Sequence, residues 1–235
     1  MNEDVDRLVE KIKSAFGADL RSVVLYGSAA AGDFHPQHSD LNVLCVLHRL
    51  GVGQLERGNE VARWWIKKGH PAPLLLTEEE IRSSADVFPI EFYDIKMQHK
   101  LLHGDDLFAT MVVPMERHRI QLEHELRSKL LRLREQYMAS HHSQRALQQL
   151  LLASVSTFGA LFRHVLVVVG QPAPAKKREV FDALAAAFGL DASPFLALLD
   201  IRQTGRSFPL AEGRALFENY LAQVERVIEE LDRRA

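Results

Sequence analysis

The hydrophobic pattern of this 235-residue chain changes character between Gly104 and Pro114. Before this stretch, segments with the helical period of 3.6 alternate with segments that have the strand period of two, whereas only the helical period remains after it. A mixed sheet with flanking helices fits the first part, and a helical bundle fits the second. We therefore expect an α+β protein of two domains, an α+β domain over residues 1–110 and an all-α domain over residues 114–235.

Turn signals and apolar periodicity place the elements of each domain. The first domain is predicted to hold, in order, a helix over 5–16, strands over 22–26 and 40–47 that pair with each other, a helix over 54–68, a strand over 74–76, a short helix after the capping-box pattern at 77–80, and a strand over 89–95. The second domain is predicted to hold helices over 115–140, 143–169, 175–188, 194–204 and 211–233.

The stretch from Val23 to Leu47 carries the most chemistry. Gly27-Ser28 follows the first strand, where a glycine lets the backbone turn with no Cβ in the way and leaves amides and the Ser28 hydroxyl to hold a phosphate. On the second strand, side-chain alternation places Asp40 and Asn42 on one face. Two such polar groups beside a phosphate-binding turn suit Mg²⁺ bound together with a triphosphate.

These residues resemble the signature of a known family. Gly27-Ser28, a gap of eleven residues and Asp40-Leu41-Asn42 are similar to the Gly-Ser … Asp-x-Asp signature of the polymerase-β-like nucleotidyltransferase superfamily. The likeness is greatest to its small bacterial members, the minimal nucleotidyltransferases and aminoglycoside adenylyltransferases, in which an α/β domain precedes a helical one. The resemblance implies Mg²⁺, ATP or another nucleoside triphosphate, and transfer of a nucleoside monophosphate to a hydroxyl group of a small molecule or a protein.

The same resemblance implies a third carboxylate on a later strand, in a segment similar to residues 89–92 (PIEF). This points to Glu91 as the general base or a further metal ligand. Period-two alternation would put Glu91 and Asp94 on opposite faces of the expected strand, so only one of them can face the site. We favour Glu91 and keep Asp94 as the second choice.

The chain departs from the family signature at Asn42, which stands where the second metal-binding aspartate is expected. An amide can offer a carbonyl oxygen to a hard cation, but the site loses one negative charge, so we expect weaker Mg²⁺ binding. Two interpretations stay open. One is a nucleotidyltransferase whose catalysis Asn42 impairs, and the other is an inactive protein that binds a nucleotide or a partner.

A third interpretation concerns the helical domain. Arg119 and His124 resemble the Arg-x4–6-His motif of HEPN-type domains, some of which cleave RNA, and Arg134 with His141 meets a looser form of the pattern. Such spacings arise by chance in a chain rich in arginine and histidine. We therefore expect a structural or solvated role for both pairs.

Composition argues against a nucleic-acid-binding, membrane or secreted protein. The net charge is -2 with interspersed signs, which gives no whole-chain field to attract nucleic acid or a membrane surface. The longest purely apolar run, Ala183 to Phe188, is too short to span a bilayer. An acidic amino terminus unlike a secretory signal, and a single cysteine, Cys45, predict a cytoplasmic protein in which Cys45 is a buried hydrophobe. The sequence leaves a homodimer open.

Overall fold

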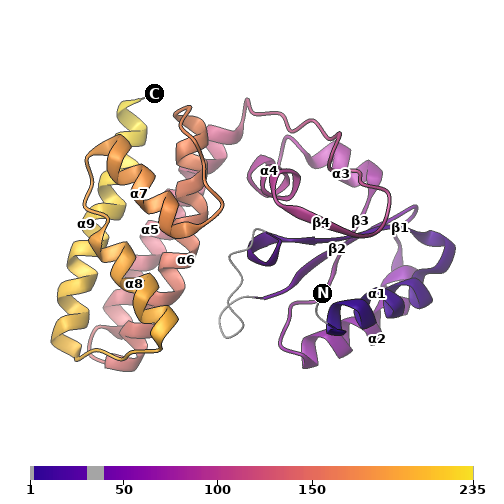
Figure 1. Cartoon of the computed structure of the whole chain (residues 1–235), viewed down its shortest axis with the longest axis horizontal. Helices are drawn as coiled ribbons and strands as arrows, with labels where there is room; N and C mark the ends of the chain where they lie inside the picture. Colours follow the sequence, from indigo (N-terminus) through magenta and orange to yellow (C-terminus); the bar gives the residue numbers. More distant parts are fainter. Residues whose placement is uncertain (1–2, 31–39, 235) are drawn as a thin grey trace. The chain divides into compact units, whose positions relative to one another are not determined.

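The structure is a computed structural model that describes residues 3–30 and 40–234 (Figure 1). Contacts within the chain form two compact units, one of residues up to Arg117 and one of residues from His118 onward. The first unit contains a sheet with helices on both faces, and the described part of the second contains helices alone. The α+β class expected from the sequence is confirmed.

The first unit is built on a four-stranded mixed sheet in the order β3-β2-β1-β4. Its strands are β1 (Leu20–Tyr26), β2 (Asn42–Leu47), β3 (Leu74–Thr77) and β4 (His99–Gly104). Strand β1 is antiparallel to both β2 and β4, whereas β2 and β3 are parallel. The expected pairing of the first two strands is confirmed, and it brings the end of β1 beside the start of β2.

Two helices cover each face of the sheet (Figure 1). Helices α1 (Glu3–Phe16) and α2 (Val52–Lys67) pack on the face that carries Val23, Val43 and Cys45. Helices α3 (Glu78–Ser84) and α4 (Pro89–Met97) pack on the face that carries Val24 and Leu44. Successive residues along a strand point to opposite faces of the sheet, so the side chains of each strand alternate between the two cores. Burial raises the pKa of the Cys45 thiol to about 12, so this cysteine is an inert core residue, as predicted.

The capping box predicted at Thr77 is present, since Thr77 accepts from the Glu80 amide at 3.1 Å and the Glu80 carboxylate accepts from the Thr77 amide at 2.7 Å. The strand predicted over 89–95 is wrong, because this segment is helix α4. Pro89 occupies the first helical turn, where its missing N–H costs nothing, and Phe92 and Ile95 bury one helical face.

The helical unit contains α5 (His118–Ser140), α6 (Gln144–Val168), α7 (Lys177–Phe188), α8 (Ser193–Thr204) and α9 (Leu210–Arg233). These five helices confirm the sequence prediction for this half of the chain. Helix α6 is long and apolar enough to cross a membrane by length and composition alone, and 56% of its most apolar window is buried. It supplies core residues such as Val155 and Phe162, as expected of a central helix.

Candidate functional site

The chain turns sharply where β1 ends. Tyr26 is extended, Gly27 has a φ of 77°, and residues Gly27–Ala29 form one 3₁₀ turn closed by an Ala30 amide that donates to the Gly27 carbonyl at 3.0 Å. A positive φ of this kind favours glycine, because a Cβ would clash with the backbone. The sequence motif Gly27-Ser28 therefore marks a real turn at the carboxyl end of the interior strand β1, with the Ser28 side chain half-buried.

This turn lies directly against the start of β2. Tyr26 pairs with Asn42 across the two strands, and a Cβ built on Gly27 would lie 3.2 Å from the Asn42 amide nitrogen. Gly27 is thus the residue that leaves room for the Asn42 side chain. The structure brings the predicted phosphate turn and the Asn42 position together, although they are fifteen positions apart in the sequence.

Asp40 precedes β2 and is exposed, while Asn42 is half-buried. Leu41 between them is 5% exposed and packs into the core under α1 and α2. Because neighbouring strand residues alternate, Asn42 lies on the opposite side of β2, on the face that also carries Leu44. Residues 31–39, which join the turn to Asp40, lie outside the described residues.

The third carboxylate is not placed as the sequence predicted. Glu91 and Asp94 lie on helix α4, not on a strand, so the expectation that they point to opposite faces is wrong. Three residues apart on a helix they share one side, with Glu91 exposed and Asp94 half-buried. Each has an interaction of its own. The strand beside β2, with the sequence Leu-Leu-Leu-Thr, supplies no carboxylate in their place.

The donors at this site suit a metal only in part. Among the described residues, no group of three or more His, Cys, Asp or Glu side chains is arranged to hold a metal ion. The start of β2 and the residues just before it offer one carboxylate, Asp40, and one neutral amide, Asn42. Magnesium is commonly held by one or two carboxylates together with substrate phosphates and water. These two ligand types fit Mg²⁺ only together with further ligands such as phosphates and water, since within the described residues they form no metal site by themselves.

His70 also touches this site, and the sequence analysis missed it. Its Nδ1 accepts a hydrogen bond from the Leu41 amide at 3.4 Å, and its ring lies 4.4 Å from the buried Trp65 ring. His70 follows the end of α2 and lies 29 positions from Leu41. No periodicity or motif links these two residues, so only the folded chain reveals the contact.

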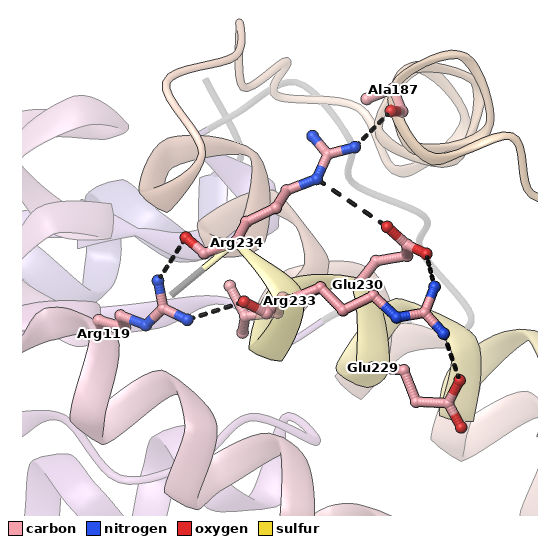
Figure 2. A network of polar contacts seen from close by, with 7 residues as sticks. Arg119, Ala187, Glu229, Glu230, Arg233 and Arg234 are labelled. Carbon is pink, nitrogen blue, oxygen red and sulfur yellow. Dashed lines mark hydrogen bonds and ion pairs between the residues drawn. The ribbon is translucent and has the colours of Figure 1, made fainter.

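The arginines and histidines of the HEPN-like spacing do not form a common cluster, and Arg119 bonds to the end of α9 (Figure 2). Arg119 bonds to Glu123 and to carbonyl groups at the end of α9, whereas the His124 side chain is 75% exposed. Five positions apart on α5, the two side chains point about 140° apart by helical geometry. Arg134 pairs with Glu225 at 2.6 Å, and His141 bonds to the Met138 carbonyl. These contacts and the exposure of His124 agree with the structural or solvated role that we expected.

Comparison with solved structures identifies a protein with a similar fold. No family model matches the chain, and no curated protein matches it. Among solved structures, spectinomycin adenyltransferase AAD(9) from Enterococcus faecialis, crystallised with ATP and spectinomycin, aligns over 99% of both chains with a TM-score of 0.58 and 15% identity. A toxin-antitoxin structure with AMP-PNP aligns with 54% of this chain and 98% of its own, at 18% identity and a TM-score of 0.35. The first alignment spans both units, and the chain therefore shares the fold of this adenyltransferase, a mixed sheet with flanking helices followed by a helical region.

Proposed function

We propose that this protein binds a nucleoside triphosphate at the Gly27-Ser28 turn, as a nucleotidyltransferase does, and that Asn42 impairs Mg²⁺-dependent transfer. The observation that carries the proposal is the packing of the Asn42 side chain against Gly27, at the position where a phosphate would meet the turn. A neutral amide there leaves Asp40, just before β2, as the one carboxylate of the Asp40–Asn42 segment. ATP is the first nucleotide to test, because the similar adenyltransferase was crystallised with it.

Each residue has a role in this proposal. Amides of the turn and the Ser28 hydroxyl donate hydrogen bonds to phosphate oxygens, and the absence of a side chain at Gly27 lets those oxygens approach the backbone. Asp40 and the Asn42 carbonyl oxygen would hold Mg²⁺, which when bound supplies positive charge for the triphosphate. Glu91 is the proposed general base, which takes the proton from an acceptor hydroxyl, with Asp94 as the second choice.

The reaction in question is in-line attack of that hydroxyl oxygen on the α-phosphorus. A bond forms between the acceptor oxygen and the α-phosphorus, the bond to the bridging oxygen breaks, and pyrophosphate leaves. The acceptor is a small hydroxylated molecule or a protein side chain. Loss of one carboxylate should slow this step more than it weakens nucleotide binding, because charge develops on the leaving oxygens only during transfer.

The variant Asn42→Asp tests the proposal. Restoring the carboxylate should raise the Mg²⁺ affinity of the nucleotide complex about tenfold, since cation affinity rises with the number of charged ligands. Calorimetric titration with ATP, with and without Mg²⁺, measures this change. Asn59→Asp on α2 is the matched control, because it adds the same charge at an exposed position outside the site and should leave the affinity unchanged.

The same preparations separate the two interpretations. Transfer of labelled nucleotide monophosphate by Asn42→Asp above the wild-type level supports an impaired enzyme. Nucleotide binding without transfer in both proteins supports the alternative, an inactive nucleotide-binding protein. If neither protein binds ATP or GTP, both interpretations are wrong. A Mg²⁺ affinity that stays flat on Asn42→Asp would show that the metal is not held at this strand.

A further inference from the structure

The segment from Asp40 to Asn42 comes before the part of β2 that pairs with β3. The parallel ladder between β2 and β3 begins at the pair Leu44 and Leu74. Leu41 therefore lies beyond the ladder on that side, and its amide N–H needs another acceptor. The acceptor is the His70 side chain, whose Nδ1 lies 3.4 Å from the Leu41 nitrogen. The His70 side chain thus supplies the acceptor that β3 does not provide for the Leu41 amide.

His70 is itself firmly held at the end of α2. The Lys68 amide donates to the Trp65 carbonyl at 3.0 Å and the Gly69 amide to the Ile66 carbonyl at 2.9 Å, which closes the last turn. Gly69 then turns the chain with a φ of 89°, a conformation that favours glycine. The His70 ring packs 4.4 Å from the ring of Trp65, which is fully buried. The imidazole is fixed both by its backbone and by its packing.

We propose that His70 is a positioning residue that orients the Asp40–Asn42 segment for the nucleotide site. The segment is tied down at Leu41 in two ways, by the buried side chain and by the amide bonded to His70. With Leu41 fixed, the residues on either side of it carry their polar groups away from the α1 and α2 core. This inference rests on the proposed function, because it assigns His70 to the same site.

The hydrogen bond also assigns the state of the ring. A nitrogen that accepts from an amide carries no proton, so the neutral imidazole holds its proton on Nε2. His70 acts here through a lone pair, with no contact to the nucleotide required. A residue that keeps the lone pair should therefore keep the role, and one that keeps only the ring should not.

Two substitutions separate the acceptor from the ring. His70→Phe keeps an aromatic ring against Trp65 and removes the acceptor, whereas His70→Asn removes the ring and can present its side-chain oxygen to the Leu41 amide. His48→Phe is the control, because His48 is exposed just beyond the other end of β2. Amide hydrogen exchange at Leu41 and ATP affinity by calorimetry are measured in all four proteins, wild type included.

We expect His70→Phe to speed exchange at Leu41 about tenfold or more while Val43 and Cys45 stay protected, and to weaken ATP binding about tenfold. His70→Asn should recover most of both quantities, and His48→Phe should match wild type. Unchanged exchange in His70→Phe, or faster exchange with unchanged ATP affinity, would overturn the positioning role. If wild type does not bind ATP, the proposed function fails, and positioning for that site falls with it, whereas the exchange data still decide whether His70 holds Leu41.

Discussion

Gly27 meets two demands at once, and alanine cannot meet either. Its φ of 77° lies in the left-handed region, and a Cβ at this position would press against the Asn42 amide at 3.2 Å. Gly17 has a similar φ of 52°, but a Cβ there would find nothing within 4 Å. The two glycines therefore separate the cost of the backbone conformation from the cost of the contact.

We predict that Gly27→Ala lowers the free energy of unfolding by about 2 kcal/mol, and Gly17→Ala by about 1 kcal/mol, because only the first adds the contact with Asn42 to the backbone strain. Urea denaturation measures both. Gly27→Ala should also reduce ATP affinity, since its methyl group occupies the proposed phosphate position. Equal destabilisation by the two substitutions would mean that the Asn42 contact has no energetic role.

The helix α4 and the strand β4 show what local sequence cannot decide. Residues 89–95 are rich in the β-branched and aromatic side chains typical of strands, yet they form a helix. Pro89 fits its first turn, and Phe92 and Ile95, three residues apart, are buried on one helical face. Strand β4 has the polar sequence His-Lys-Leu-Leu-His-Gly, and it forms because β1 offers it a free edge. Tertiary pairing overrode a low strand propensity in β4, whereas in α4 the helical spacing and Pro89 outweighed the strand-like composition.

Arg119 joins α5 to the last turn of α9 (Figure 2), where the Leu231 carbonyl accepts from the Arg234 amide at 3.3 Å and can accept a second hydrogen bond. Its guanidinium donates to the Leu231 carbonyl at 2.7 Å and to the Arg234 carbonyl at 3.2 Å, and it also bonds to Glu123 at 2.8 Å. Arg234 in turn donates to the Ala187 carbonyl of α7 at 3.0 Å. Three helices meet in this network.

We predict that Arg119→Ala lowers the free energy of unfolding by about 2 kcal/mol, because it removes charge-assisted hydrogen bonds from helix-end carbonyls. Arg132→Ala, at an exposed position of the same helix, should change stability by no more than about 0.5 kcal/mol. Chemical denaturation followed by circular dichroism measures both. A change for Arg119→Ala as small as that of the control would contradict the capping role.

Across the whole molecule, the parts readable from the sequence are those set by periodicity and by neighbouring residues. The five helices after His118 and the pairing of β1 with β2 follow from apolar spacing, and the pairing places Gly27 beside Asn42. The His70 contact and the position of Glu91 depend on how distant elements pack, which no local pattern encodes. The fold could therefore be predicted from the sequence more fully than the arrangement of the candidate site could.

The helical unit also contains a buried pair of histidines on α5 and α6. His118 Nε2 lies 2.8 Å from His164 Nδ1, and both side chains are at most 1% exposed. Burial, and secondly the nearby His164, lower the pKa of His118 from 6.5 to about 4. In the native state this ring stays neutral at neutral pH, because a charge there would lose its hydration.

This pair predicts an acid-sensitive stability. As the pH falls below 6.5, His118 is protonated in the unfolded chain, whereas in the native state it is protonated only near pH 4. The free energy of unfolding therefore decreases between these two pH values and levels off below about pH 4. The full loss amounts to about 3 kcal/mol. Thermal melts between pH 7.5 and 4 should show a smaller decline for His118→Gln than for wild type, while His124→Gln, at an exposed position, should follow wild type. A decline of equal size in His118→Gln would mean that other groups cause it.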